Sequence, residues 1–252
     1  MNQLSIITIT YQAEPFIRRT LESLMKQTSQ DFEYIVIDGG SKDKTLAILA
    51  EYQSRINFLL SEPDRGLYDA MNKGLAVAKG KYIWFMNAGD VLADDRLVED
   101  LVPFLRQEPD VVYGDALFVD NMGHSRGLRS VVTPHTLPQN LTWRDMWLGM
   151  RVCHQSFIAR KSIAPLYTLD NLSADIDWEI QILKKSKSTL YFPRPLSHYL
   201  EGGISNQQLK KSWLDRFWVL KSHFGWATTL IAHGIISLRG ALKIVRDRKK
   251  YW

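Results

Sequence analysis

The first 120 residues alternate between two hydrophobic periods, and this alternation constrains the fold more than any other feature of the chain. Short β-rich runs lie at 4–10, 33–38, 56–60, 81–86 and 111–113, and helix-like stretches lie at 14–27, 43–53, 67–78 and 94–106. Repeated strand–helix–strand units build a largely parallel sheet that helices cover on both faces. The sequence therefore predicts an α/β fold whose ligands bind beyond the carboxyl ends of the strands.

Composition narrows the class of protein. The chain has 252 residues, of which 45% are hydrophobic and 23% are charged, and this mixture excludes a disordered, collagen-like or multispanning membrane protein. Its one cysteine, Cys153, cannot form an intrachain disulfide or a cysteine-based zinc site. No basic-then-apolar leader precedes the first strand, so we expect a protein of the reducing cytoplasm.

The basic character of the chain belongs to its C-terminus. Residues 209–252 hold ten Lys or Arg against two Asp or Glu, within a total net charge of +5. A nucleic-acid-binding protein would spread basic and aromatic residues over its main fold, so we expect no nucleic-acid partner and favour an anionic membrane surface. We predict a catalytic domain at 1–208 and a basic helical extension at 209–252.

The extension has the pattern of an amphipathic helix. Apolar residues recur at helical spacing, with basic residues on a neighbouring face: Ile231, Ile235, Leu238, Leu242 and Val245. The uncharged stretch at 222–238 is too short to span a bilayer. Peripheral contact with the membrane and packing on the catalytic domain or on a second copy remain alternatives.

Polar residues follow several of the predicted strands. Asp38 ends one strand before two glycines, where it can accept hydrogen bonds from a base or ribose, or simply cap a turn. Asp90 follows another strand and can hold Mg²⁺ or Mn²⁺, or cap the next helix. Lys73 can face phosphate oxygens or solvent. Residues 120–150 are rich in turn formers and predict irregular structure over a site.

Two further segments carry titratable groups. Asp175 and Asp177 begin a predicted helix, where the helix dipole keeps a carboxylate ionised and available as a general base. A structural cap is the alternative for both. His154 and His198 can be core residues or ligands, and His198 is a candidate third metal ligand.

Taken in order, these segments resemble a family 2 glycosyltransferase of the GT-A fold. The motifs are SIITITYQ, YIVIDGGSKDKT, EPDRGLYDAMNKG, KYIWFMNAGD, CHQSF and SADIDWEIQI, and the likeness spans residues 3–206. The chain is most similar to bacterial enzymes that build exopolysaccharide or O-antigen units, including the colanic acid type.

The resemblance assigns roles to individual positions. It implies that Thr10 and Tyr11 line the nucleotide pocket, that Asp38 contacts the base, and that Asp64, Asn72 and Lys73 lie near the diphosphate. Asp90 matches the last acid of the DxD-type metal motif, whereas Asn87 stands where that motif has its first acid. Asp175 matches the catalytic aspartate, and the segment at 153–155 matches one that borders donor sugar and acceptor.

The activity that this resemblance implies is an inverting transfer of sugar. The donor would be a nucleoside-diphosphate sugar, the acceptor a saccharide carried on a polyprenyl diphosphate, and the cofactor a divalent cation, Mn²⁺ or Mg²⁺. Asn87 supports an alternative, a nucleotide-sugar-binding subunit without catalysis. A sugar-nucleotide pyrophosphorylase or a dinucleotide-dependent dehydrogenase is not favoured, because TYQAEPF lacks the glycine-rich loop that either enzyme needs after its first strand.

Overall fold

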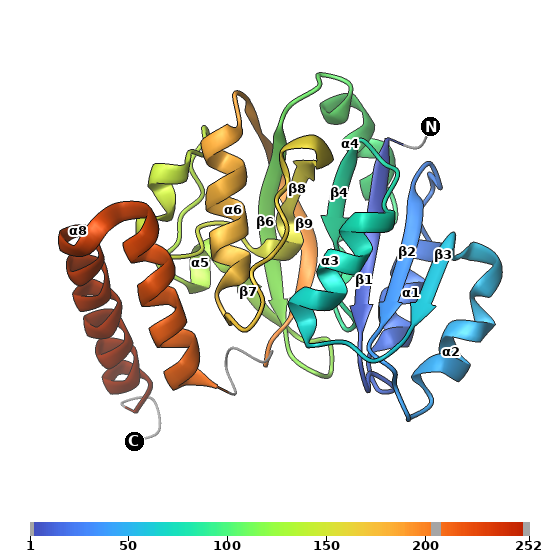
Figure 1. The fold of residues 1–252 in the computed structure, drawn as a ribbon, viewed down its shortest axis with the longest axis horizontal. Coiled ribbons are helices and arrows are strands. Elements are labelled where there is room, and N and C mark those ends of the chain that lie inside the picture. Colours follow the sequence, from blue (N-terminus) through green and yellow to red (C-terminus); the bar gives the residue numbers. More distant parts are fainter. Residues whose placement is uncertain (1–2, 203–207, 249–252) are drawn as a thin grey trace.

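The computed structural model describes residues 3–202 and 208–248, with side chains up to residue 239 (Figure 1). Over these residues one nine-stranded sheet has the order β3-β2-β1-β4-β8-β6-β9-β5, with β7 beside β6. The strands are β1 (Leu4–Thr10), β2 (Glu33–Asp38), β3 (Phe58–Ser61), β4 (Tyr82–Phe85), β5 (Val91–Leu92), β6 (Val111–Val119), β7 (Ser125–Leu128), β8 (Phe157–Arg160) and β9 (Thr189–Leu200).

The larger helices flank this sheet. They are α1 (Ile17–Met25), α2 (Thr45–Glu51), α3 (Leu67–Val77), α4 (Leu97–Leu105), α5 (Arg129–Val132), α6 (Ala174–Lys185) and α8 (Leu209–Arg248). Short 3₁₀ turns include η2 (Trp143–Leu148) and η3 (His154–Ser156). The predicted α/β fold, with its sheet, flanking helices and C-terminal helical extension, is confirmed.

Burial explains why the first strands run parallel in the centre of the molecule. Every residue of β1 and β2 is buried, and successive side chains enter opposite core clusters. Ile7 packs with Met71 of α3 on one face, whereas Ile6 packs with Leu21 of α1 on the other. The strands β3, β2, β1 and β4 are all parallel, while β8 is antiparallel to both of its neighbours, β4 and β6.

The strand order reverses between β1 and β4, and this reversal positions the site. The chain runs from β1 through β2 to β3 on one side of β1 and then crosses by way of α3 to β4 on its other side, which leaves a crevice at the carboxyl ends of β1 and β4. The second half of the sheet adds the ends of β6 and β9 at the same edge. Because β8 is antiparallel to both β4 and β6, the strands β6 and β9 run in the same direction as β4.

The segment at 120–150 is more regular than its composition predicts. It contains β7, α5 and η2, and β7 pairs with β6 from Leu117↔Leu128 onward. The prediction of irregular structure was wrong at these three elements, of which β7 is stabilised by its pairing with an existing strand, whereas the residues at 120–124 and 133–142 form no helix or strand, as expected.

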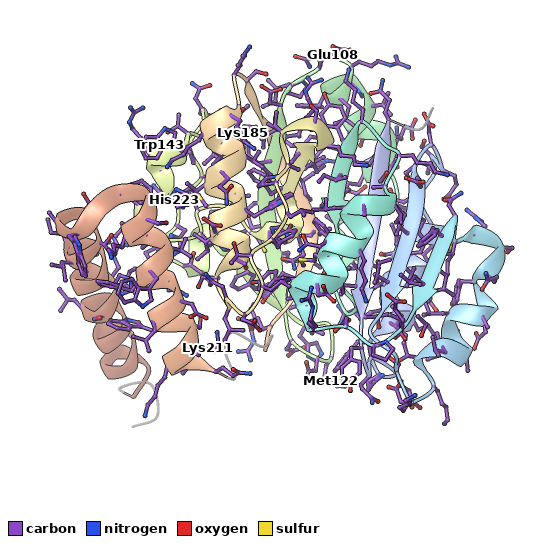
Figure 2. The ribbon with its side chains drawn as sticks, in the orientation of Figure 1. Glu108, Met122, Trp143, Lys185, Lys211 and His223 are labelled. Carbon is purple, nitrogen blue, oxygen red and sulfur yellow. The ribbon has the colours of Figure 1, made fainter. Side chains whose placement is uncertain are left out.

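The helix α8 consists of two arms that we call the hairpin. Gly225 has φ 77° and ψ 174°, which breaks the helix, and the arms on either side run antiparallel in Figure 1. His223, labelled in Figure 2, joins the first arm to α6: its Nε2 lies 2.6 Å from Oδ1 of Asp177, and Lys184 Nζ lies 2.8 Å from its Nδ1.

The apolar residues expected on one face of this extension differ in their exposure. Ile231 and Leu238 are exposed and Ile235 is partly buried, while Leu242 and Val245 lie outside the residues whose side chains are described. Within residues 3–202 and 208–248, no helix is long and apolar enough to cross a bilayer. The division of the chain at residue 208 stays a prediction.

Candidate active site

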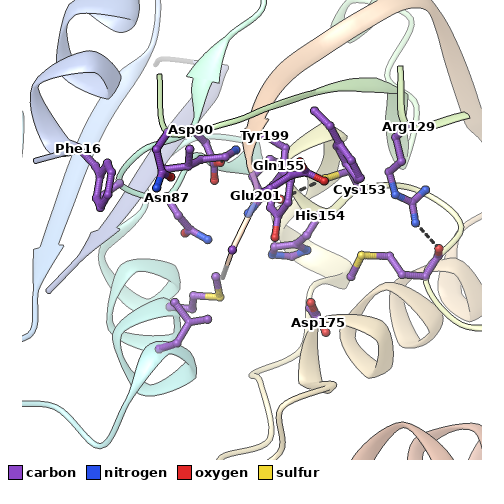
Figure 3. A pocket seen from close by; sticks show the side chains of 18 of the residues that line it. Phe16, Asn87, Asp90, Arg129, Cys153, His154, Gln155, Asp175, Tyr199 and Glu201 are labelled. Atoms are coloured by element: carbon purple, nitrogen blue, oxygen red, sulfur yellow. Dashed lines mark hydrogen bonds between the residues drawn. The ribbon is translucent and has the colours of Figure 1, made fainter. Parts of the chain in front are cut away.

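A pocket of about 630 Å³ lies at the carboxyl edge of the sheet. Three predicted site residues line it: Asn87, Asp90 and Asp175. Figure 3 shows Asn87 and Asp90 on one side, Asp175 and Arg129 on the other, and His154 between them. Residues that are far apart in the sequence thus share one cavity, as expected for ligands bound at a reversal of strand order.

Asp90 is held in the wall of this pocket. Its Oδ1 accepts a hydrogen bond of 2.8 Å from the backbone N–H of Leu200, and its backbone carbonyl accepts one from Thr20. The side chain is only 4% exposed, and burial raises the pKa of its carboxyl to about 7. Carboxyl groups whose pKa is raised this far by burial are typical of functional sites.

Asn87 and Asp90 each offer an oxygen atom of the kind that hard divalent cations bind. The Oδ1 atom of Asn87 is buried and has no hydrogen-bond partner in the described part of the chain, and Asp90 keeps one carboxylate oxygen beyond its bond to Leu200. Mg²⁺ commonly takes one or two protein oxygens and completes its shell with water and substrate phosphates. Among the described residues, no group of three or more His, Cys, Asp or Glu could hold a metal by itself, and His198 does not line the pocket.

Asp175 lies in the first turn of α6 and faces the pocket. Burial raises the pKa of its carboxyl, and the positive charge of Arg216 acts in the opposite direction. The second acid of this helix, Asp177, accepts a hydrogen bond from Gln181 and contacts His223, so it joins α6 to the hairpin instead. Of the two acids, Asp175 alone lines the pocket.

His154 separates the two sides of the pocket. Its ring stacks on Phe85 with 5.5 Å between centroids, and its Nε2 lies 3.0 Å from the hydroxyl of Tyr167. Burial lowers the pKa of His154 to about 4, so the imidazole is neutral at pH 7.

Other predicted donor-binding residues gather beyond the ends of β1, β2 and β3. A Cβ atom added at Gly39 would lie 2.6 Å from Oδ2 of Asp64 and 3.2 Å from Cδ2 of Tyr11. Because Gly39 has no side chain, the carboxylate of Asp64 and the ring of Tyr11, which is 63% exposed, lie directly against its backbone, and we call these three residues the notch. Thr10 is buried beneath this notch, where its carbonyl accepts the N–H of Gly39.

Asp38 shapes the loop after β2. Its carboxylate accepts hydrogen bonds from the backbone N–H groups of Gly40 and Ser41 and from the hydroxyls of Ser41 and Ser61. The side chain is fully buried. In this structure Asp38 therefore holds the loop that lies beside the notch, and its contact with a base stays a prediction.

Asn72 and Lys73 lie on α3 and do not line the pocket. The amide of Asn72 donates to the carbonyl of Tyr167 at 3.0 Å and accepts its N–H at 2.7 Å. Lys73 forms an ion pair of 2.8 Å with Glu62. Their predicted place near the diphosphate is untested.

Sequence reasoning missed several residues that line the pocket. Arg129 of α5 lies in the segment expected to be irregular, and Tyr199 and Glu201 follow from the pairing of β9 with β6. Cys153, His154 and Gln155 also line the pocket, and these three residues form the CHQ segment that the resemblance had placed beside donor sugar and acceptor.

Comparison with known proteins places this geometry in a family. The family description "Glycosyl transferase family 2" matches residues 5–165. A "PGL/p-HBAD biosynthesis glycosyltransferase" of Mycobacterium tuberculosis is 31% identical over 229 residues, covering 84% of this chain and 82% of the relative. An "Uncharacterized glycosyltransferase" of Haemophilus influenzae is 23% identical over 251 residues, covering 96% of this chain and 98% of the relative.

Solved structures share the fold. S. aureus TarS 1–349 in complex with UDP-GlcNAc has a TM-score of 0.66 at 17% identity, covering 86% of this chain and 65% of that chain. The mannosyltransferase PcManGT from Pyrobaculum calidifontis in complex with GDP-Man and Mn²⁺ has a TM-score of 0.61 at 14% identity, covering 99% of this chain and 82% of that chain. The likeness recognised in the motifs is thereby confirmed: the chain belongs to glycosyl transferase family 2 and is a glycosyltransferase with a GT-A-like α/β fold.

Proposed function

We propose that this glycosyltransferase transfers a sugar from a nucleoside-diphosphate sugar to a hydroxyl group of a saccharide acceptor, with inversion at the anomeric carbon. One observation carries the proposal: Asp175 faces the same pocket as Asn87 and Asp90, from its opposite side (Figure 3). A base and an oxygen-rich site on opposite sides of one cavity suit an in-line displacement.

The proposed reaction is a single displacement. The acceptor oxygen attacks the anomeric carbon and its proton passes to Asp175, while the bond from that carbon to the diphosphate oxygen breaks and its electron pair leaves with the nucleoside diphosphate. Burial raises the pKa of Asp175, which strengthens it as a base, and Arg216 favours its ionised form.

The donor would span the notch and the pocket. Tyr11 and Asp64 lie against Gly39, and an exposed aromatic ring beside a carboxylate suits a nucleotide base and a ribose hydroxyl. The complexes of TarS with UDP-GlcNAc and of PcManGT with GDP-Man support a nucleotide-sugar donor. Asp90 and Asn87 would hold Mn²⁺ or Mg²⁺, which neutralises diphosphate charge when bound.

For the acceptor, we propose a saccharide linked to a polyprenyl diphosphate, used in surface polysaccharide synthesis at the cytoplasmic face of a membrane. The hairpin supports this location. Trp213, Trp218 and Trp226 are each about half exposed, and Lys221 Nζ lies 4.6 Å and 4.3 Å from the ring centroids of Trp218 and Trp226. Indole rings beside basic groups are typical of proteins that bind anionic bilayer surfaces.

A nucleotide-release assay tests the catalytic proposal. Wild-type protein, Asp175→Asn and the matched control Asp177→Asn are incubated with UDP-, GDP- and dTDP-sugars in Mn²⁺, Mg²⁺ or EDTA. We expect one donor to be hydrolysed and Asp175→Asn to reduce its release about 10²- to 10⁴-fold, because a positioned base is lost. Asp177→Asn should retain activity, since Asp177 contacts His223 and Gln181 instead of the pocket.

Two results would contradict the proposal. Full turnover by a folded Asp175→Asn variant would remove Asp175 as the base. Thermal stabilisation by a nucleotide without any release, even when lipid-linked saccharides are supplied, would favour the alternative of a binding subunit without catalysis.

A further inference from the structure

Three arginines lie next to one another beside the pocket, and we define Arg129, Arg151 and Arg216 as the arginine cluster, of which Arg129 alone lines the pocket. Arg129 lines the pocket and is only 7% exposed. Its guanidinium donates to the backbone carbonyls of Arg151 at 2.6 Å and of Met150 at 2.5 Å. The α5 helix therefore delivers a buried cation to the segment at 149–151.

The first arm of the hairpin delivers another cation to the same segment. The Cδ atom of Arg216 lies 3.6 Å from the position that a Cβ atom on Gly149 would take. The Nε atoms of Arg151 and Arg216 are both buried and have no hydrogen-bond partner among the described residues. Arginines from α5, from the 149–151 segment and from α8 thus lie close together, and the Nε–H groups of Arg151 and Arg216 are available to donate hydrogen bonds.

The charge of this cluster is not balanced by ion pairs. Within residues 3–202 and 208–239, none of the three arginines has a carboxylate oxygen within 4 Å. The positive charges of the cluster also act on the nearby imidazole of His135. Burial, followed by the charges of Arg129, Arg151, Arg239 and Arg216, lowers the pKa of His135 to about 3. Arg129 is buried and the other two arginines are partly buried, so their charges are partly removed from water without a counterion, and an anion that binds there is favoured.

The position of the cluster identifies the anion. Asn87 and Asp90, the proposed site for the donor diphosphate, lie across the pocket from Arg129, whereas Asp175 lies on the side of Arg129 (Figure 3). The positive charge of Arg216 also lowers the pKa of Asp175, against the larger effect of burial, so Arg216 lies within electrostatic range of this carboxyl. In the proposed function, on which this step rests, Asp175 takes its proton from the acceptor, so an anion beside it belongs to the acceptor.

We propose that the arginine cluster is a binding site for a phosphate or diphosphate group of the acceptor. Guanidinium groups match phosphate oxygens with paired N–H donors, and several arginines together suit the two phosphates of a diphosphate. The cluster would hold the charged end of a phosphorylated acceptor while its sugar hydroxyl reaches Asp175. It would thereby select acceptors that carry phosphate over neutral saccharides.

Titration with inorganic pyrophosphate tests this site. The full chain is first saturated with the nucleoside diphosphate that stabilises it most, so that the donor site is filled, and pyrophosphate binding is measured by calorimetry. Variants Arg151→Gln and Arg216→Gln remove one charge each. Arg144→Gln is the matched control, because Arg144 is exposed and lies 5.0 Å from the ring centroid of Trp143, outside the cluster.

We expect pyrophosphate to bind the nucleotide-loaded protein and each cluster variant to weaken it about tenfold, as for the loss of a charged hydrogen bond. Arg144→Gln should bind like wild type, and nucleotide affinity should be equal in all four proteins. Circular dichroism checks that each variant is folded.

Three results would overturn the proposal. Pyrophosphate binding that competes with the nucleotide, together with weaker nucleotide binding by the variants, would assign the cluster to the donor. Equal binding by wild type and both cluster variants, or no binding at all, would remove the site. If no nucleotide binds, the proposed function fails by itself, and pyrophosphate titration of the nucleotide-free protein still tests the cluster.

Discussion

Replacing Asp90 with asparagine should stabilise the protein while impairing its activity. Burial raises the pKa of the Asp90 carboxyl from 3.8 to about 7, so the folded protein resists losing this proton. Below pH 4 the carboxyl is protonated in the folded and unfolded states alike. As the pH rises from about 4 to about 7, the unfolded chain loses this proton while the folded protein keeps it, so stability falls across this range.

The size of this effect follows from the shift. A difference of about 3 pKa units corresponds to about 4 kcal/mol, fully expressed above pH 7. The Asp90→Asn variant avoids this loss because its amide does not ionise, and its oxygen can still accept the N–H of Leu200. We therefore expect it to be more stable than wild type at pH 8 by up to about 4 kcal/mol, or about 8–16 °C in Tm for a chain of this size.

Urea unfolding in EDTA at pH 5 and pH 8 measures the difference. The stability gain of Asp90→Asn should increase by about 3 kcal/mol between these two pH values. Asp31→Asn, which removes an exposed carboxylate, is the control for a change in net charge. An equal gain at both pH values, or a variant less stable than wild type at pH 8, would refute the idea that Asp90 is a buried acid kept for function at the expense of stability.

Two further predictions concern the notch and the hairpin. Gly39→Ala would place its methyl group 2.6 Å from Asp64 Oδ2, so calorimetry should show nucleotide binding about fivefold to tenfold weaker; unchanged affinity would mean that the notch does not bind the nucleotide. Trp218→Ser combined with Trp226→Ser should reduce co-sedimentation with anionic vesicles about tenfold, since both rings are half exposed on the hairpin. Leu46→Ser on α2, at the far end of the sheet, should sediment like wild type (Figure 1), and undiminished sedimentation of the double variant would exclude the hairpin as the membrane contact.

Local patterns predicted the first half of the fold well. The apolar runs that became β1, β2 and β4 are buried on both faces, so hydrophobicity alone marks them as central parallel strands. Asp175 was identified from its place at the start of a helix and from its motif, both of which depend on neighbouring residues only. Its position in the same pocket as Asn87 and Asp90 then follows from the convergence of strand ends at one edge of the sheet.

Other features depended on contacts between distant segments. Both hydrogen-bonding ends of the Asn72 amide are engaged by Tyr167, 95 residues further along the chain, which no local pattern indicates. The break at Gly225 turned one expected amphipathic helix into two arms, and so exposed Ile231 and Leu238.

The sequence by itself determined the α/β class, the family and the candidate base, because each depends on periodicity or on residues close together in the chain. Tertiary structure decided which charges meet. Arg129 reaches the pocket because β7 pairs with β6 and α5 follows β7 directly. Arg216 reaches the segment at 149–151 because the contact of His223 with Asp177 holds the hairpin against α6. Electrostatic and packing interactions between such distant residues are fixed only when the whole sheet and its helices have assembled.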